Sequence, residues 1–196
     1  MSSRIQNAFL GSLVADAVAM PVHWYYDTEA LDRDFPDLQG YEAPKPKHPS
    51  SILWRSKYQP LNESADILRE QAQYWGKRDV HYHQFLGAGD NTLNLRVAVE
   101  LYHFTLTQGS YDARAWLDRY VDCMLKEDWH QDTYVEEYHR AFFDNRARGK
   151  ALNKCGIDDV HIGGLAPVPA LLAALDVIHE SPADIDVKTL VDHVSL

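Results

Sequence analysis

The sequence predicts an all-α protein, and three observations support this prediction. Several stretches place apolar residues at the three- and four-residue spacing of an amphipathic helix. Residues that favour helix ends stand beside these stretches. No stretch alternates apolar and polar residues over a strand's length between turn signals. The chain has 196 residues, 45% of them hydrophobic. This is enough to bury one core, so we expect a single domain over residues 1–196.

Charge and cysteine content narrow the function classes. The formal net charge is -10 and the isoelectric point is near 5.4. This balance argues against nucleic acid and against an anionic membrane surface as partners. Two cysteines, Cys123 and Cys155, are too few for a disulfide framework. Because we also find no signal peptide and no long apolar run, we expect a cytoplasmic protein.

The first helix is expected over residues 3–20, where Ile5, Phe9, Leu13 and Ala17 form the apolar stripe. Asp16 lies beside this stripe. A carboxylate on a core-facing edge is costly unless it is hydrogen-bonded, paired or bound to a metal. We expect Asp16 to cap a neighbouring helix, with a direct role in a site as the alternative.

The stretch from residue 28 to about residue 62 is expected to be a long loop, because its helical pattern is lost among five prolines. Long loops in compact domains are usually lids or mobile covers. Its segment 45–51 contains two lysines that could contact phosphate, although a solvated loop tip is the favoured interpretation. A short helix is expected over residues 63–76.

Two histidines, His81 and His83, precede the central part of the chain. A His-x-His pair can bind zinc when both rings share one face of a strand. No third ligand stands at a useful spacing, so we favour packing or ligand-facing histidines. A zinc hydrolase that also uses Cys155 is the weaker alternative.

The stretch 93–104 predicts the central helix, because it is apolar around most of its circumference and such helices are usually buried. Asp90, Asn91 and Thr92 stand at its start. Each is a good N-cap residue, and capping is the simplest interpretation. Carboxylate, amide and hydroxyl oxygens are also ligands of hard cations, so the alternative is half of a Mg²⁺ site.

Two further helices are expected directly after the central one. Asp112 should cap the first of them, which carries an apolar stripe from Ala113 to Met124. The stretch 133–136 has the pattern of a capping box for the second, which should run to Gly149. The linker 129–132 between these helices is interpreted as a turn.

A glycine pair, Gly163 and Gly164, precedes a helix that carries Leu165, Leu171 and Leu175. Glycine-rich turns at a helix N-terminus bind anions through backbone N–H groups, so the pair is a candidate diphosphate site. A tight turn is the simpler interpretation. A last helix is expected over residues 186–196.

Four blocks together resemble the ADP-ribosylglycohydrolase family, in particular its branch related to J-type crystallins and selenoprotein J. Residues 11–23 are similar to the family's opening Gly-Asp-Ala block, and residues 88–92 stand where the family has its Thr-Asp-Asp-Thr metal motif. Residues 161–169 resemble its glycine-rich block, and residues 130–143 resemble the segment typical of the crystallin-related branch. The similarity covers essentially the whole chain.

The resemblance implies a single-domain orthogonal helical bundle with a dinuclear Mg²⁺ centre. It implies a hydrolase that cleaves the N- or O-glycosidic bond of an ADP-ribosylated substrate. The partner would be an ADP-ribose-type small molecule or an ADP-ribosylated protein. The residues concerned are Asp90 as the catalytic residue, Asp90, Asn91 and Thr92 toward the metal, and Asp16, His23, His161, Gly163 and Gly164 toward the substrate.

The chain also departs from the family pattern. Gly89 and Asn91 replace a threonine and an aspartate of the metal motif, Ala15 replaces a glycine, and His23 stands at a glutamate position. Each lost carboxylate weakens a divalent site. The family's Asp-x-Asp-Thr motif has no counterpart, and we expect a fragment or truncation without the C-terminal helices. The alternative function is therefore a catalytically inactive, crystallin-like structural or ligand-binding protein, and the oligomeric state stays open.

Overall fold

The structure is a computed structural model that describes residues 3–179 and 187–194. Within these ranges it contains helices and no strand, so the all-α prediction is confirmed. The α-helices are α1 (Arg4–Ala19), α2 (Thr28–Asp34), α3 (Leu93–Gln108), α4 (Ala113–Leu125), α5 (Glu137–Ala147), α6 (Val168–Ile178) and α7 (Val187–Val194). Short 3₁₀ helices interrupt the connections between them.

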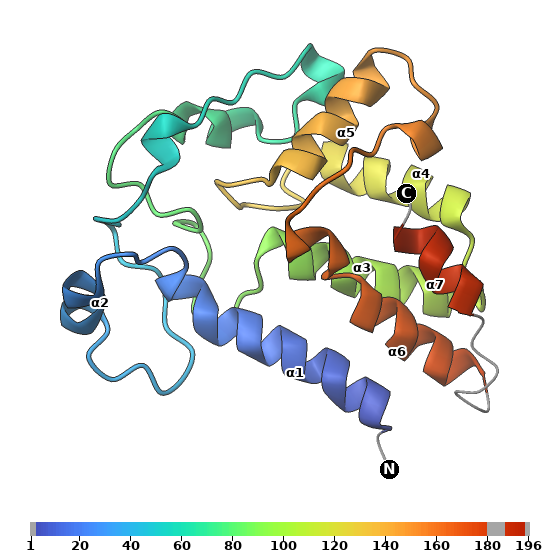
Figure 1. Ribbon diagram of the computed structural model, residues 1–196, viewed down its shortest axis with the longest axis horizontal. Coiled ribbons are helices and arrows are strands. Elements are labelled where there is room, and N and C mark those ends of the chain that lie inside the picture. The colour runs from blue at the N-terminus through green and yellow to red at the C-terminus, as the bar shows by residue number, and fades with distance from the viewer. Residues whose placement is uncertain (1–2, 180–186, 195–196) are drawn as a thin grey trace.

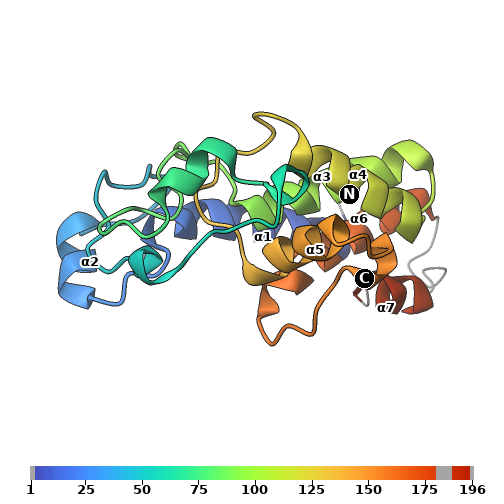
Figure 2. The same cartoon turned by 90° about the horizontal axis from the view of Figure 1, so that it is seen from above.

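Helix α3 is the central element, as its sequence predicts. Helices α1 and α6 pack beside it (Figures 1 and 2). The contact between the three helices is built from Phe9 on α1, Ala98 on α3, and Ala170 and Ala173 on α6. Alanines at such positions let helix axes approach closely.

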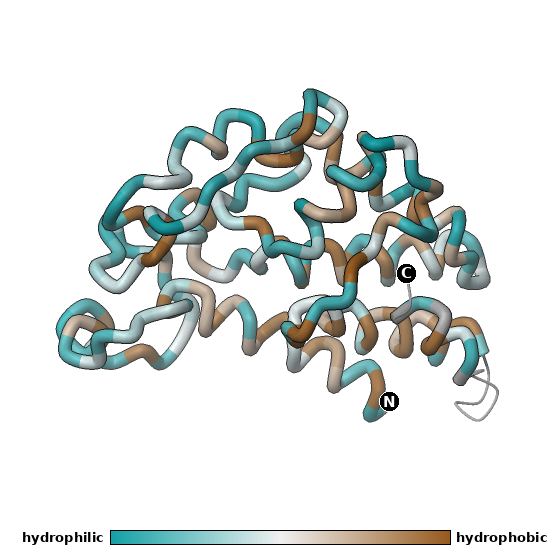
Figure 3. The backbone as a smooth tube through the Cα atoms, turned by 45° about the horizontal axis from the view of Figure 1, so that its top comes forward, coloured by the Kyte–Doolittle hydropathy of each residue, from teal (hydrophilic) through white to brown (hydrophobic). Residues whose placement is uncertain are grey.

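The main core lies between α3, α4, α5, one face of α6 and the segment 53–82. Its fully buried members include Leu53, Leu101, Met124, Phe143 and Leu171. The hydrophobic stretches recur along the helices, while much of the chain between them is hydrophilic (Figure 3). The core therefore joins segments that are far apart in the sequence.

One segment, Arg4–Val22, is long and apolar enough to span a membrane when judged by length and composition alone. In the structure this segment is α1 with the 3₁₀ helix η1 (Met20–Val22), and α1 packs against α6. The sequence-based expectation that no membrane is a partner stays a prediction.

Three expectations about the secondary structure are wrong. The stretch 28–62 is not one continuous loop, because α2 begins at Thr28, where the Asp27 side chain accepts hydrogen bonds from two backbone N–H groups. The stretch 63–76 forms two 3₁₀ helices, η3 (Glu63–Ala65) and η4 (Arg69–Tyr74), instead of an α-helix. The supposed capping box at 133–136 does not open a helix, since α5 begins at Glu137 with Glu136 as its N-cap residue.

Other expected elements are confirmed. Helix α1 covers the first predicted stretch, and Asp112 caps α4 through a hydrogen bond from Ala115 N to its Oδ1 at 2.7 Å. Helix α6 begins at Val168, after the 3₁₀ helix η6 (Ile162–Leu165) that contains the glycine pair. Helix α7 lies within the last predicted helix, whose ends at 186 and at 195–196 lie outside the described residues.

The N-terminus of α3 is held by carboxylates from distant segments. Thr92 is its N-cap residue, yet the Thr92 side chain caps nothing and instead donates a hydrogen bond to Oδ1 of Asp16 at 2.8 Å. Oδ2 of Asp16 accepts from Thr92 N at 2.8 Å, and Oδ2 of Asp132 accepts from Leu93 N at 2.9 Å. Negative charge is favourable at this end of the helix dipole. The interpretation of Asp16 as a cap for a neighbouring helix is therefore confirmed.

We expect Asp16→Ala to lower the free energy of unfolding by about 2–3 kcal/mol, because charged hydrogen bonds to a helix end are lost. Urea denaturation measures the change. Asp118→Ala, which removes an exposed carboxylate from α4, serves as the control and should change stability by less than about 0.5 kcal/mol. Equal effects of the two substitutions would contradict the capping role.

Candidate functional site

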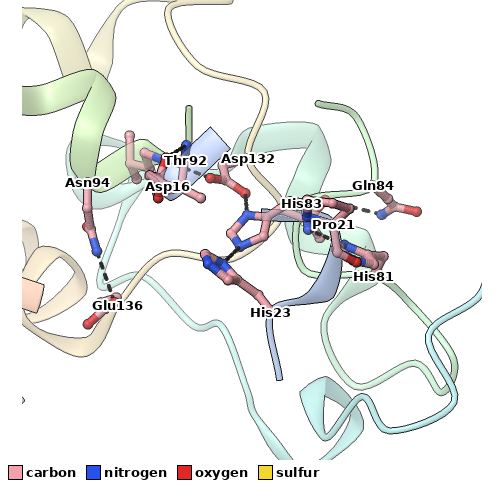
Figure 4. A network of polar contacts seen from close by, with 12 residues as sticks. Asp16, Pro21, His23, His81, His83, Gln84, Thr92, Asn94, Asp132 and Glu136 are labelled. Atoms are coloured by element: carbon pink, nitrogen blue, oxygen red, sulfur yellow. Dashed lines mark hydrogen bonds and ion pairs between the residues drawn. The ribbon is translucent and has the colours of Figure 1, made fainter. Parts of the chain in front are cut away.

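A small polar cavity of about 270 Å³ opens between the start of α3, the end of α1 and the segment 132–136. Figure 4 shows the polar side chains around it, which come from four separate parts of the chain. Its lining includes three carboxylates, from Asp16, Asp132 and Glu136, and it includes no lysine or arginine. The imidazole of His23 forms part of its wall. This cavity, named here the His23 cavity, is the candidate functional site.

A chain of two hydrogen bonds joins His23 to a buried carboxylate. Nδ1 of His83 lies 2.6 Å from Oδ1 of Asp132, and Nε2 of His83 lies 3.0 Å from Nδ1 of His23 (Figure 4). A carboxylate only accepts hydrogen bonds, so Nδ1 of a neutral His83 carries the hydrogen and its Nε2 accepts. Nδ1 of His23 therefore donates, which leaves Nε2 of His23 unprotonated. The Asp132–His83–His23 chain is named here the histidine relay.

The environment keeps the His23 ring neutral. The pKa of His23 is lowered to about 4, mainly by burial and also by the nearby His83, while Asp16 and Asp132 act in the opposite direction. Two adjacent imidazoles resist carrying two positive charges. At neutral pH the Nε2 lone pair of His23 is therefore available as a hydrogen-bond acceptor or base.

Two more histidines hold the turn that carries His23. Nε2 of His81 lies 3.0 Å from the carbonyl oxygen of Pro21, and Nε2 of His48 lies 2.7 Å from the carbonyl oxygen of His23. Both rings are fully buried. Nδ1 of His81 accepts a hydrogen bond from His83 N at 3.0 Å, so the same ring joins the backbone of Pro21, two residues before His23, to that of His83.

The residue after His23 has a strained backbone. Trp24 has φ of 58°, a left-handed conformation that a bulky residue rarely adopts. Its ring packs against Tyr82, His83 and Tyr134, with the Tyr82 centroid at 4.3 Å. Such strain persists only where the surroundings enforce it, and it occurs often at functional sites.

Glu136 forms part of the cavity wall and is oriented by a second buried network. Its Oε1 accepts a hydrogen bond from Nδ2 of Asn94 at 3.0 Å. Oδ1 of Asn94 accepts from Tyr138 Oη at 2.6 Å and from Nε2 of His139 at 3.2 Å, which fixes the amide with its nitrogen toward Glu136. Nδ1 of His139 in turn accepts from Tyr120 Oη at 2.5 Å.

The structure brings some of the residues expected from the sequence to this cavity. Asp16, His23 and Thr92 line it. Asn91 does not line the cavity but contacts Asp16, since its Nδ2 donates to Oδ2 of Asp16 at 3.0 Å and to the carbonyl oxygen of Leu13 at 2.7 Å. Asp16, Asn91 and Thr92 are therefore joined to one another by hydrogen bonds.

Asp90 lies apart from the His23 cavity. Its side chain is exposed, and its Oδ2 accepts a hydrogen bond from Gly87 N at 2.7 Å within its own loop. It lines a separate cavity of about 420 Å³, on whose wall Asp132 also lies. Asp90 and the glycine pair therefore do not share one of these cavities, and a catalytic role for Asp90 stays a prediction.

The glycine-rich segment adjoins a larger cavity of about 600 Å³ that Gly164 and His161 line. His161 is exposed and pairs with Asp159 at 2.5 Å. A Cβ on Gly163 would lie 2.7 Å from Oε2 of Glu136, so any larger residue at this position would displace the Glu136 carboxylate. The adjacent carboxylate opposes a diphosphate at the pair, and the binding roles of the three residues stay predictions.

The described residues do not form a Mg²⁺ cage. Mg²⁺ needs several oxygen ligands in octahedral arrangement, mainly from carboxylates and water. Asp90 is the one carboxylate among Asp90, Asn91 and Thr92, and the other two direct their donor groups to Asp16. No group of three or more His, Cys, Asp or Glu in the described part of the chain is arranged to hold a metal ion. Mg²⁺ stays a prediction, and no chemical step proposed below passes through it.

The zinc alternative finds no support in the placement of Cys155. Its thiol is buried and directed to the carbonyl oxygens of Lys150 and Ala151, at 3.7 and 3.4 Å. The polar atoms of His81 and His83 are already used within the turn and the relay.

Sequence reasoning missed Asp132, Glu136 and the function of His83. Asp132 was assigned to a turn and Glu136 to a capping box, because both stand at helix boundaries where such residues are common. The His-x-His spacing did single out His83, although its partners lie 49 and 60 residues away. No local pattern encodes these contacts.

No protein-family model, no curated protein and no solved structure matches this chain. The resemblance to the ADP-ribosylglycohydrolase family therefore rests on the four sequence blocks alone.

Because His81 and His139 are buried, we expect the free energy of unfolding to decrease in acid. Burial lowers the pKa of His81 and of His139 to about 3, against about 6.5 in the unfolded chain. Below about pH 6.5 the unfolded state binds protons that the folded state does not, so stability falls as the pH decreases toward 3. At pH 5.5 we expect a loss of about 1 kcal/mol from each residue, measured by urea denaturation against pH 7.5. His81→Gln, which keeps a donor for Pro21, should flatten this dependence, whereas the exposed His103→Gln should not.

Asn91→Asp tests whether the Asp16 region accepts a cation. The substitution replaces an amide 3.0 Å from Oδ2 of Asp16 by a second carboxylate. We expect it to lower stability by about 1–3 kcal/mol without metal. Millimolar Mg²⁺ should raise the Tm of this variant by about 3 °C more than that of the wild type, measured by scanning calorimetry. Asn91→Ser is the control without added charge. An Asn91→Asp variant as stable as the wild type and indifferent to Mg²⁺ would contradict this expectation.

Proposed function

We propose that the chain is a hydrolase of the ADP-ribosylglycohydrolase type that cleaves the glycosidic bond of a ribosylated substrate, with His23 as its general base. The observation that carries the proposal is the histidine relay, which leaves an unprotonated Nε2 on the wall of a polar cavity. The four sequence blocks support the same family and its orthogonal helical bundle.

The chemistry is substitution at the anomeric carbon, with water as the nucleophile. Nε2 of His23 takes a proton from the attacking water, the new C–O bond forms, and the bond to the leaving nitrogen or oxygen breaks with its electron pair. The proton then passes to the leaving group, so the products are the free sugar and the unmodified acceptor. A positioned base of this kind contributes about 10²–10⁴-fold to such reactions.

The remaining residues hold the base and the sugar. Asp132 stabilises the positive charge that develops on His83 and His23 when the proton is taken. Glu136, oriented by Asn94, offers an acceptor oxygen for a ribose hydroxyl. Three carboxylates without a lysine or arginine in the lining disfavour a diphosphate there. We therefore place the ribose, and not the diphosphate, in the His23 cavity.

We expect His23→Gln to lower kcat at least about 100-fold, and Asp132→Asn or His83→Gln to lower it about 10-fold or more, with smaller changes in KM. The measurement is release of free ADP-ribose from N- and O-linked ADP-ribosyl peptides, followed by liquid chromatography. His103→Gln, an exposed histidine on α3, is the control and should keep full activity. Since the neutral ring is required, kcat/KM should fall as the pH decreases through about 4. Wild-type turnover that survives His23→Gln would contradict the proposed base.

The second candidate function is a catalytically inactive, crystallin-like protein that binds a ligand without turnover. The hydrogen bonds that join Asp16, Asn91 and Thr92 favour it, since these side chains are used in holding α3. If the protein has this second function, ADP-ribose raises the Tm of the wild type, and neither the N-linked nor the O-linked ADP-ribosyl peptides are cleaved.

A further inference from the structure

Basic side chains gather around the indole of Trp54, and none of them lines the His23 cavity. The guanidinium carbon of Arg78 lies 3.9 Å from the centroid of the Trp54 ring, and that of Arg55 lies 4.8 Å from it. Both arginines are exposed. The two guanidinium carbons therefore lie within about 9 Å of each other. This group, with Lys47 and Lys77, is named here the Trp54 patch.

Backbone hydrogen bonds gather the patch from three segments. Gly76 N donates to the carbonyl oxygen of Leu53 at 3.3 Å, which sets residues 77–78 beside residues 54–55. His48 N donates to the carbonyl oxygen of Asp79 at 3.0 Å, which brings Lys47 to the same region. The ammonium of Lys77 lies over the Tyr74 ring, 5.2 Å from its centroid. The positive groups are therefore held by fixed backbone and by aromatic rings.

The charge of this region is opposite to that of the chain. Residues 45–78 contain seven of the 19 lysines and arginines and three of the 29 aspartates and glutamates, a net charge of +4. The remaining residues carry a net charge of -14. The positive charge is therefore concentrated in this segment, while the rest of the chain is strongly acidic.

The cations of the patch lack carboxylate partners. Lys47, Arg55, Lys77 and Arg78 make no ion pair with any residue that the structure describes. Asp79 is the carboxylate next to them in the sequence, and its backbone has a left-handed φ of 59°. Convergence of like charges without a counter-charge is unfavourable, and a bound anion would relieve it.

We propose that the Trp54 patch binds a compact oligophosphate, with the two guanidinium groups on neighbouring phosphoryl groups. Arginine donates paired hydrogen bonds that match phosphate oxygens, and its position over an aromatic ring fixes the guanidinium plane. A ligand of a few phosphates fits within the patch. An extended polyanion such as single-stranded nucleic acid would continue onto the acidic remainder of the surface and be repelled there. The site shares no residue with the lining of the His23 cavity.

Isothermal titration calorimetry of the full chain with inorganic tripolyphosphate tests this proposal. We expect binding at 50 mM salt that weakens at 200 mM salt. Arg55→Gln and Arg78→Gln should each weaken binding about 10-fold, and the double variant about 50-fold or more. Arg114→Gln removes an equal charge from the exposed face of α4 and should leave the affinity within about 2-fold. These exposed substitutions should leave the circular dichroism spectrum unchanged.

Three results would overturn the proposal. The first is no binding of tripolyphosphate at 5 mM and 50 mM salt. The second is equal weakening by Arg114→Gln and Arg78→Gln, which would show general charge attraction alone. The third is tighter binding of a single-stranded oligothymidylate than of tripolyphosphate, which would identify the patch as a nucleic-acid surface.

Discussion

The buried N-terminus of α3 is the constraint on which the rest of the structure depends. The first backbone N–H groups of a helix have no partner within it, and in a buried position each needs one from elsewhere. Thr92 does not supply one from its own side chain. The partners come from Asp16 and Asp132, which are 76 residues before Thr92 and 39 residues after Leu93. Satisfying two N–H groups therefore fixes α1 and the segment after α4 against the same helix end.

One of these carboxylates has two functions, which links the fold to the candidate chemistry. Oδ2 of Asp132 caps α3, and Oδ1 of Asp132 orients the ring of His83. The same carboxylate therefore holds both the helix end and the middle member of the histidine relay. The strained backbone at Trp24 costs about 1–3 kcal/mol. Packing of Trp24 on His83 and Tyr134 offsets this cost and holds His23 at the cavity wall. Stability and site geometry are therefore not separable at this point of the molecule.

Sequence reasoning succeeded where the determinants are local. The periodicity of α1, α3 and α4 and the cap at Asp112 each depend on residues within one or two turns. Helix α2 was missed because seven residues are too few to show a period, although Asp27 was present as its cap. The relay was not predictable, because it depends on rings and a carboxylate from three separate segments. The sequence suggested Asp90 as a metal ligand because Asn91 and Thr92 follow it. In the structure its side chain accepts a hydrogen bond within its own loop. The sequence alone does not distinguish a metal ligand from a loop-stabilising carboxylate.

The protonation pattern of the two relay histidines tests the central claim most directly. Long-range ¹H–¹⁵N correlation spectra of the imidazole rings report which nitrogen carries the hydrogen, without any substrate. At pH 7 we expect His83 and His23 both to be protonated at Nδ1, with an unprotonated Nε2 on His23. Asp132→Asn should alter this pattern on both rings. A His23 ring protonated at Nε2 in the wild type, or a pattern that Asp132→Asn leaves unchanged, would contradict the account.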